Sequence, residues 1–322
     1  MIRQIVIPLD GSTLAEAVLP HASRLAKAFG AEALVLRVVG TRLSDVGHYI
    51  DTFDWRLKRV EAERYVERIA ARLREDGAAA RWEVAVGRAS EQILGTARRV
   101  QADLIVLTTH GEGGRSEFHV SGTAAKVVGP ADTSVLLVPP PEQAAAPASV
   151  SYQTILVPVD CSPRADWALY LAGSVARITG AELVLLYVVT MPEAIGGATE
   201  ASETRALARR LRQANCEAAR VHLDAQVAML AQSGLRARVR LVENDDVARA
   251  IRTAADEEDA SLVAMAAHGA RAASEVPHGM VAASLLGHSQ RPLLLLQDSP
   301  ATRLDVPADF AQPGWRPAPE AM

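Results

Sequence analysis

A glycine-rich stretch in the first half of the chain contains the residues best suited to binding chemistry. An apolar run at 104–107 ends at Thr108, and Gly111 opens a loop that continues to Gly122 and Thr123, where a helical pattern begins. Glycine lets the backbone turn and approach a ligand, and the free amides of a first helical turn favour an anion. The order of strand, glycine loop and helix start therefore predicts a phosphate-type site, although a glycine loop by itself is weak evidence.

Two further features are expected at the same edge of the fold. Asp10 follows Pro8 at the end of the first apolar run, and Asp160 has the matching place in the second half. Such a carboxylate can accept hydrogen bonds from ribose hydroxyls, or it can cap a turn or the next helix, and the sequence leaves both roles open. Val38 and Val188 end the second apolar run of each half. Their backbone groups could pair with a base edge, while their side chains are typical of a core.

These residues lie on a regular alternation of apolar runs and helical patterns. The first half predicts strands at 2–9, 33–39, 81–86, 104–107 and 135–138, with helices at 14–29, 55–76, 90–100 and from residue 122. Five strands alternating with four helices are typical of a doubly wound, Rossmann-like α/β unit with a mostly parallel sheet.

The same pattern then restarts, which indicates an internal duplication. The residues at 155–160 match 5–10 at an offset of 150, and the offset grows to 158 where 268–269 match 110–111. The increase falls mainly in a long helical stretch at 200–232. We therefore expect two tandem units at 1–139 and 152–297, a semi-rigid Pro/Ala linker at 140–151 and a Pro-rich tail at 298–322.

The composition narrows the possible classes of protein. Of the 322 residues 49% are hydrophobic and only 4% aromatic, and the formal net charge is -4. This balance argues against nucleic acid as a partner, because no broad basic face is available. The two cysteines, Cys161 and Cys216, have no metal-ligand or CxxC spacing. No signal peptide or membrane-length apolar run is evident, so we expect a cytoplasmic protein without a membrane partner.

Three of these motifs together resemble the universal stress protein family. They are the strand ending IPLDGS at 7–12, the THG turn at 109–111 and the Gly-Thr pair at 122–123, and the resemblance covers about 3–138 and 153–297. It implies an adenine nucleotide alpha hydrolase-like fold. The nucleotide-binding branch of the family has a motif of Gly, two residues, Gly, nine residues and Gly-Ser or Gly-Thr. The resemblance to that branch implies ATP binding, with the strand-one Asp on the ribose and the motif amides on the phosphates.

Both halves depart from this motif. In the first half Thr108 replaces the first Gly, and ten residues separate Gly111 from Gly122. In the second half Ala266 replaces the first Gly, and Gly269 keeps the nine-residue spacing to Gly279 before Met280 replaces the hydroxyl residue. We therefore expect ATP or another adenine nucleotide, with or without Mg²⁺, in the first half, and a weakened or lost site in the second.

The leading hypothesis is an adenine-nucleotide-binding sensor or regulator of the stress response rather than a metabolic enzyme. The second is an interaction or scaffold protein without nucleotide, whose halves form an internal pseudo-dimer through their last strands at 135–138 and 293–296; two chains could also form a homodimer. A slow ATP hydrolase is third, because no P-loop lysine or evident acidic pair for magnesium is present. His110 and His268 are interpreted as turn residues with local hydrogen bonds.

Overall fold

The computed structural model describes residues 2–41, 52–110, 122–140, 149–190, 202–267, 279–288 and 290–297. The first half contains β1 (Gln4–Pro8), the 3-10 turn η1 (Ala15–Val18), α1 (Leu19–Phe29), β2 (Glu32–Val39), α2 (Thr52–Glu75), β3 (Ala79–Val86), α3 (Ala89–Arg99), β4 (Leu104–Thr108), α4 (Gly122–Val128) and β5 (Ser134–Val138). The second half contains β6 (Thr154–Pro158), α5 (Pro163–Thr179), β7 (Glu182–Val189), α7 (Ser202–Gln232), β8 (Arg236–Glu243), α8 (Val247–Glu257), β9 (Leu262–Ala266), α9 (Met280–His288) and β10 (Leu293–Leu296).

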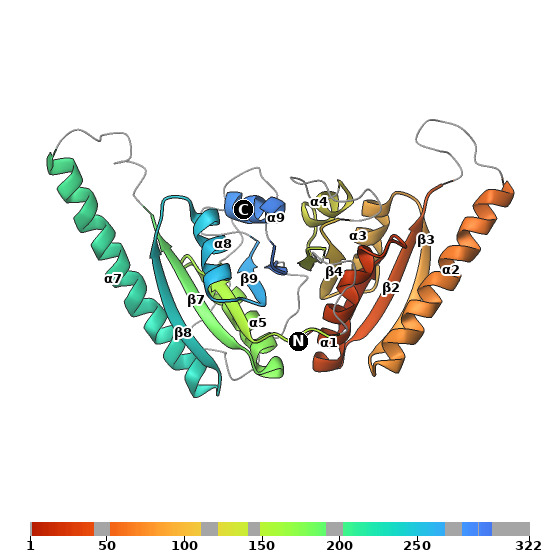
Figure 1. Ribbon diagram of the computed structural model, residues 1–322, viewed down its shortest axis with the longest axis horizontal. Coiled ribbons are helices and arrows are strands. Elements are labelled where there is room, and N and C mark those ends of the chain that lie inside the picture. The colour runs from red at the N-terminus through yellow and green to blue at the C-terminus, as the bar shows by residue number, and fades with distance from the viewer. Residues whose placement is uncertain are drawn as a thin grey trace, which may run out of the picture.

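All described strands join one ten-stranded sheet in the order β3-β2-β1-β4-β5-β10-β9-β6-β7-β8 (Figure 1). Neighbouring strands within each half are parallel, whereas β5 and β10 pair antiparallel at the centre, with Leu136 opposite Leu294. The predicted fold of two doubly wound units is confirmed, and so is the predicted pairing of the two last strands. Joining there hides two fully apolar strand edges that would otherwise invite aggregation.

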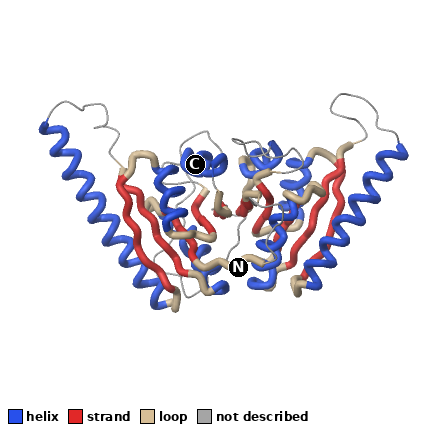
Figure 2. Tube along the Cα trace, viewed as in Figure 1, coloured by secondary structure: helices blue, strands red, loops and turns tan. Residues whose placement is uncertain are grey.

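Helices cover both faces of the sheet (Figure 2). Side chains alternate along each strand, so Ile5 and Ile7 face one layer while Val6 faces the other. The first layer is formed by α1, α2, α5 and α7, and the second by α3, α4, α8 and α9. Each hydrophobic core runs through both halves, because its buried residues come from the strands of both. Across the described ranges, no helix combines the length and apolar character that crossing a membrane requires.

The first predicted helix is interrupted. The sequence predicts one helix over 14–29, but the structure has a 3-10 turn at 15–18 followed by α1 from Leu19. Pro20 explains the break, because proline lacks a backbone N–H and fits only the first turn of a helix. The second half has no such proline and forms the continuous α5, where the Ser162 hydroxyl accepts a hydrogen bond from Ala165 N at 3.2 Å.

The growth of the repeat offset is located in the helices, as predicted. The helix α7 has 31 residues and α2 has 24, a difference of seven. The strand register moves by the same amount, since Glu32 pairs with Ala79 and Glu182 with Arg236. The helix α2 also begins earlier than predicted, at residue 52 instead of 55. Both long helices lie at the outer flanks of the molecule (Figure 1).

Candidate functional site

The strand order reverses at two places along the sheet. In the first half the order places β2 and β3 on one side of β1 and β4 and β5 on the other, so the switch point lies between β1 and β4. The equivalent point in the second half lies between β6 and β9. In open α/β sheets ligands bind outside the carboxyl ends of the strands at such a point. Pro8, half-buried at the end of β1, and buried Thr108, at the end of β4, flank the first one.

Asp10 forms the turn that leaves this edge. Its Oδ1 accepts a hydrogen bond from Ser12 N at 2.9 Å and another from Ser12 Oγ at 2.6 Å. In the second half Asp160 Oδ1 accepts one from Ser162 N at 3.1 Å. The turn role considered for both aspartates is therefore confirmed. The turn engages Asp10 through Oδ1, and the part of its carboxylate in ligand binding stays a prediction.

Arg37 adds a charge to the first switch point that the sequence analysis did not single out. Its Nη1 donates to Leu9 O at 3.3 Å, beneath the turn. Gly11, at φ +85°, lies so close that an added Cβ would be 3.4 Å from Arg37 Nη2. The second half has Cys161 and Tyr187 at the corresponding positions. Only the first site therefore has this arginine. In the sequence, the one indication of its role was a charged residue within an apolar run.

The end of β4 is tied down by local hydrogen bonds. Thr109 N donates to Val138 O at 3.0 Å, and His110 N donates to Thr108 Oγ1 at 3.3 Å. His110 Nδ1 lies 2.9 Å from Thr109 Oγ1, so the predicted local bonding of this histidine is confirmed. Gly111 and Gly269 lie outside the described residues, as do His268, most of the linker and the tail at 298–322.

Gly122 and Thr123 are the first two residues of α4, and both are exposed. The buried positions of α4 and α9 match at an offset of 158, because Ala124 pairs with Ala282 and Val127 with Leu285. In this register Gly122 corresponds to Met280, whereas half-buried Gly279 precedes its helix. The Gly-Thr pair of the first half is thus shifted one residue into the helix. Because the offset is already 158 at His110, the two halves have the same number of residues between this histidine position and the buried face of the helix.

The penultimate valines of β2 and β7 are neither fully buried nor fully exposed. Val38 and Val188 are half-buried and pack against the second core layer. Trp55 was not predicted to contribute here, yet its Nε1 donates to Gly40 O at 3.0 Å, so the start of α2 bonds the chain that leaves β2. The tryptophan also lies 6.0 Å from the Arg59 guanidinium. The chain leaving β2 is therefore tied to a second element.

The second site is less suited to charged ligands or to thiol chemistry. Burial, together with the nearby Asp166 and Asp160 carboxylates, raises the pKa of the Cys161 thiol to about 11. A thiol with this pKa stays protonated at neutral pH and is a poor nucleophile. Among the described residues, no group of three His, Cys, Asp or Glu side chains is arranged to hold a metal ion.

Comparison with known protein families gives a direct match to both halves. Residues 1–139 and 151–297 match the universal stress protein family. The chain belongs to this family. A universal stress protein of Methanocaldococcus jannaschii is 28% identical over 148 residues, which cover 44% of this chain and 84% of that protein. One from Synechocystis is 26% identical over 148 residues, covering 42% of this chain and 96% of that protein.

Solved structures extend the likeness to the tandem arrangement. A universal stress protein from Archaeoglobus fulgidus is 21% identical and superposes with a TM-score of 0.66, covering 91% of this chain and 98% of that one. A universal stress protein from Pseudomonas aeruginosa is 16% identical and superposes with a TM-score of 0.65, covering 92% of this chain and 93% of that one. At these identities the likeness concerns the fold, and it shows that two units in one chain are an arrangement found elsewhere.

Proposed function

We propose that this tandem universal stress protein is a cytoplasmic sensor or regulator that binds ATP or another adenine nucleotide in its first half. The observation that supports this most is the grouping of Asp10, Gly11 and Arg37 at the carboxyl end of β1, next to the β1–β4 switch point. A carboxylate for ribose and a cation for phosphate are the two groups that a nucleotide needs at such an edge. The second half has Cys161 in place of Gly11 and Tyr187 in place of Arg37, so we propose that its site is degenerate.

Each residue has a distinct part in this proposal. The Asp10 carboxylate would accept from the ribose hydroxyls, and the backbone at Val38 would pair with the base edge. The amides at Gly111, Gly122 and Thr123 would hold the phosphates. Thr108, in the place of a motif glycine, would contribute mainly backbone. Mg²⁺ would enter with the nucleotide, because this ion is commonly held through phosphates and a few waters rather than by an all-protein cage.

The test is a calorimetric titration of ATP into the full chain and matched variants. Asp10→Asn keeps an Oδ1 acceptor for the turn but removes the negative charge, so nucleotide affinity should fall by on the order of tenfold or more. Asp160→Asn makes the same change in the second half and should leave the affinity unchanged. We expect close to one site per chain. Equal affinity in the wild type and Asp10→Asn would sink the proposal.

One observation favours a second candidate, a scaffold that uses no nucleotide. The two halves share one sheet through Leu293 to Leu295 on β10 and Val135 to Leu137 on β5, which is the internal pseudo-dimer that such a protein needs. In this case the units at 1–139 and 152–297 would bind partner proteins, or a second chain as a homodimer, and the linker at 140–151 would only join them. Melting temperatures that do not change with ATP, ADP or AMP would favour this candidate.

A further inference from the structure

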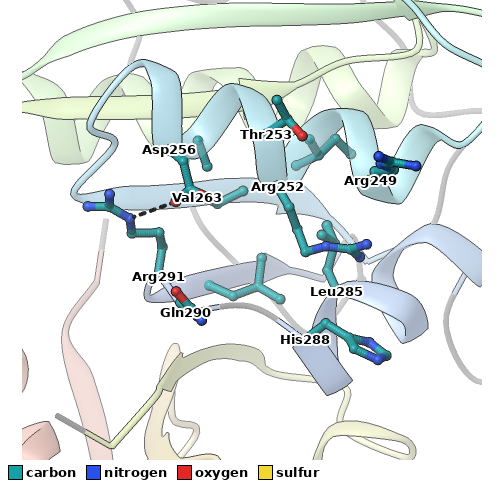
Figure 3. Close-up of a pocket in the computed structure, with 12 residues that line it drawn as sticks. Arg249, Arg252, Thr253, Asp256, Val263, Leu285, His288, Gln290 and Arg291 are labelled. Carbon is teal, nitrogen blue, oxygen red and sulfur yellow. Dashed lines mark ion pairs between the residues drawn. The ribbon is translucent and has the colours of Figure 1, made fainter. Parts of the chain in front are cut away.

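A groove lies between α8 and α9 in the second half, on the face of the sheet that carries the second core layer (Figure 3). Its volume is about 360 Å³, the lower end of the range for small-molecule sites. Apolar side chains from both helices and from β9 and β10 line part of it, namely Ile251, Val263, Leu285 and Leu293. Apart from Ala255 the remaining lining is polar, and most of its charge is positive.

Three cationic or potentially cationic side chains stand at one end of this groove. Arg249 and Arg252 are one turn apart on α8, and the Arg252 side chain extends toward α9, where His288 lies on the opposite wall (Figure 3). The His288 Nδ1 is 3.0 Å from the carbonyl oxygen of Ser284, so Nδ1–H donates to it, and a protonated ring would have Nε2–H as a second donor for an anion.

The arginines at the two ends of the groove differ in their ion pairs. At the far end Arg291 is neutralised by Asp256 at 3.5 Å and Asp259 at 3.0 Å. Within the described part of the chain, no carboxylate forms an ion pair with Arg249 or Arg252. As far as the described residues go, the end lined by these two arginines therefore keeps a positive charge without an ion-pair partner.

The first half provides an internal control, because the same two helices exist there without these cations. At the 158-residue offset that aligns α3 with α8 and α4 with α9, Glu91 stands for Arg249, Leu94 for Arg252 and Pro130 for His288. Glu91 forms an ion pair with Arg88 at 3.3 Å. The packing of the two helices therefore does not require the basic residues, since the duplicate folds with an acid, a leucine and a proline in their places.

We propose that the α8–α9 groove is a binding site for a small, multiply charged anion of the phosphate class. Arginine presents a planar fork of donors that matches phosphate oxygens in pairs, and two of them one helical turn apart can hold one such group from the same wall. From the other wall a protonated His288 donates Nε2–H to the anion. The small volume excludes a polymer as the occupant, and the site is independent of the nucleotide site at β1 and β4.

The test uses pyrophosphate as the probe, titrated calorimetrically into the full chain at physiological salt. Arg252→Leu copies the first half and should raise the Kd by on the order of tenfold, while Arg249→Glu with Arg252→Leu should abolish binding. Arg98→Leu, in the equivalent helix of the first half, is the matched control and should bind like the wild type. Thermal melting checks that each variant is folded.

Three outcomes decide the proposal. Pyrophosphate binding that survives the Arg249→Glu, Arg252→Leu pair overturns it, and so does a wild type that binds neither pyrophosphate nor orthophosphate. Orthophosphate as a second probe distinguishes a site for a single phosphate group from one that needs two linked groups, and tight binding of either supports the phosphate class. The Asp10→Asn variant should bind pyrophosphate like the wild type but bind ATP more weakly. Failure of the nucleotide proposal and failure of this one therefore give different results.

Discussion

A buried hydrogen bond between the two halves should make the stability of this protein depend on pH. His21 on α1 and Tyr152, just before β6, lie 2.8 Å apart between Nδ1 and the hydroxyl oxygen, and both are buried at 7% and 1% exposure. Burial lowers the pKa of His21 from 6.5 to about 4. The histidine is therefore neutral in the folded protein at pH values where the unfolded chain already binds a proton.

The pKa difference gives the size of the effect. The unfolded state binds more protons between pH 6.5 and 4, so stability is complete above pH 6.5 and is lost as the pH falls toward 4. A shift of this size corresponds to about 3 kcal/mol of unfolding free energy, at roughly 1.4 kcal/mol for each pH unit. That is a large part of the total stability of a typical domain.

Urea unfolding at a series of pH values measures this contribution, and a double variant isolates it. Leu171 is the counterpart of His21 in the second half, so His21→Leu copies a residue that the repeat already accepts. Combined with Tyr152→Phe it removes both polar groups and leaves neither unpaired. We expect the wild type to lose about 3 kcal/mol more than the double variant between pH 7 and pH 4. Parallel pH curves for the two proteins would refute the reasoning.

Three further changes test the fold. Leu136→Ala at the seam should lower the free energy of unfolding by about 2–5 kcal/mol, because this side chain is fully buried; an unchanged urea midpoint would contradict that. Gly11→Ala should lower the free energy of unfolding by about 1 kcal/mol, because φ is +85° at this position. The control Gly40→Ala, which has open space around it, should have the melting temperature of the wild type. Hydrogen bonds from Arg238 and also from Arg240 lower the pKa of Glu258 to about 2, so this carboxylate stabilises the fold above pH 4.5 and less as the pH falls toward 2. Acid unfolding of Glu258→Gln should lack that loss of stability, and identical acid curves for the two proteins would argue against it.

The sequence by itself determined the duplication and the order of strands and helices. These features are local, since an apolar run, a proline or a glycine restricts the backbone near it whatever the rest of the chain does. Even the 3-10 turn before α1 has a local cause in Pro20, which the apolar periodicity alone did not reveal. The pairing of the last strands was also predictable, because both are short and wholly apolar.

Only the tertiary structure decided which side chains meet. Arg37 lies beneath the turn at Gly11, and His21 bonds to a tyrosine 131 residues away. The cations of the α8–α9 groove come from two helices separated by a strand, and each alone reads as ordinary surface charge. The alignment of α4 with its repeat counterpart α9 likewise followed only from the residues that each helix buries. Contacts of this kind depend on packing across the whole sheet, and periodicity along one segment carries no information about the partner that it will face.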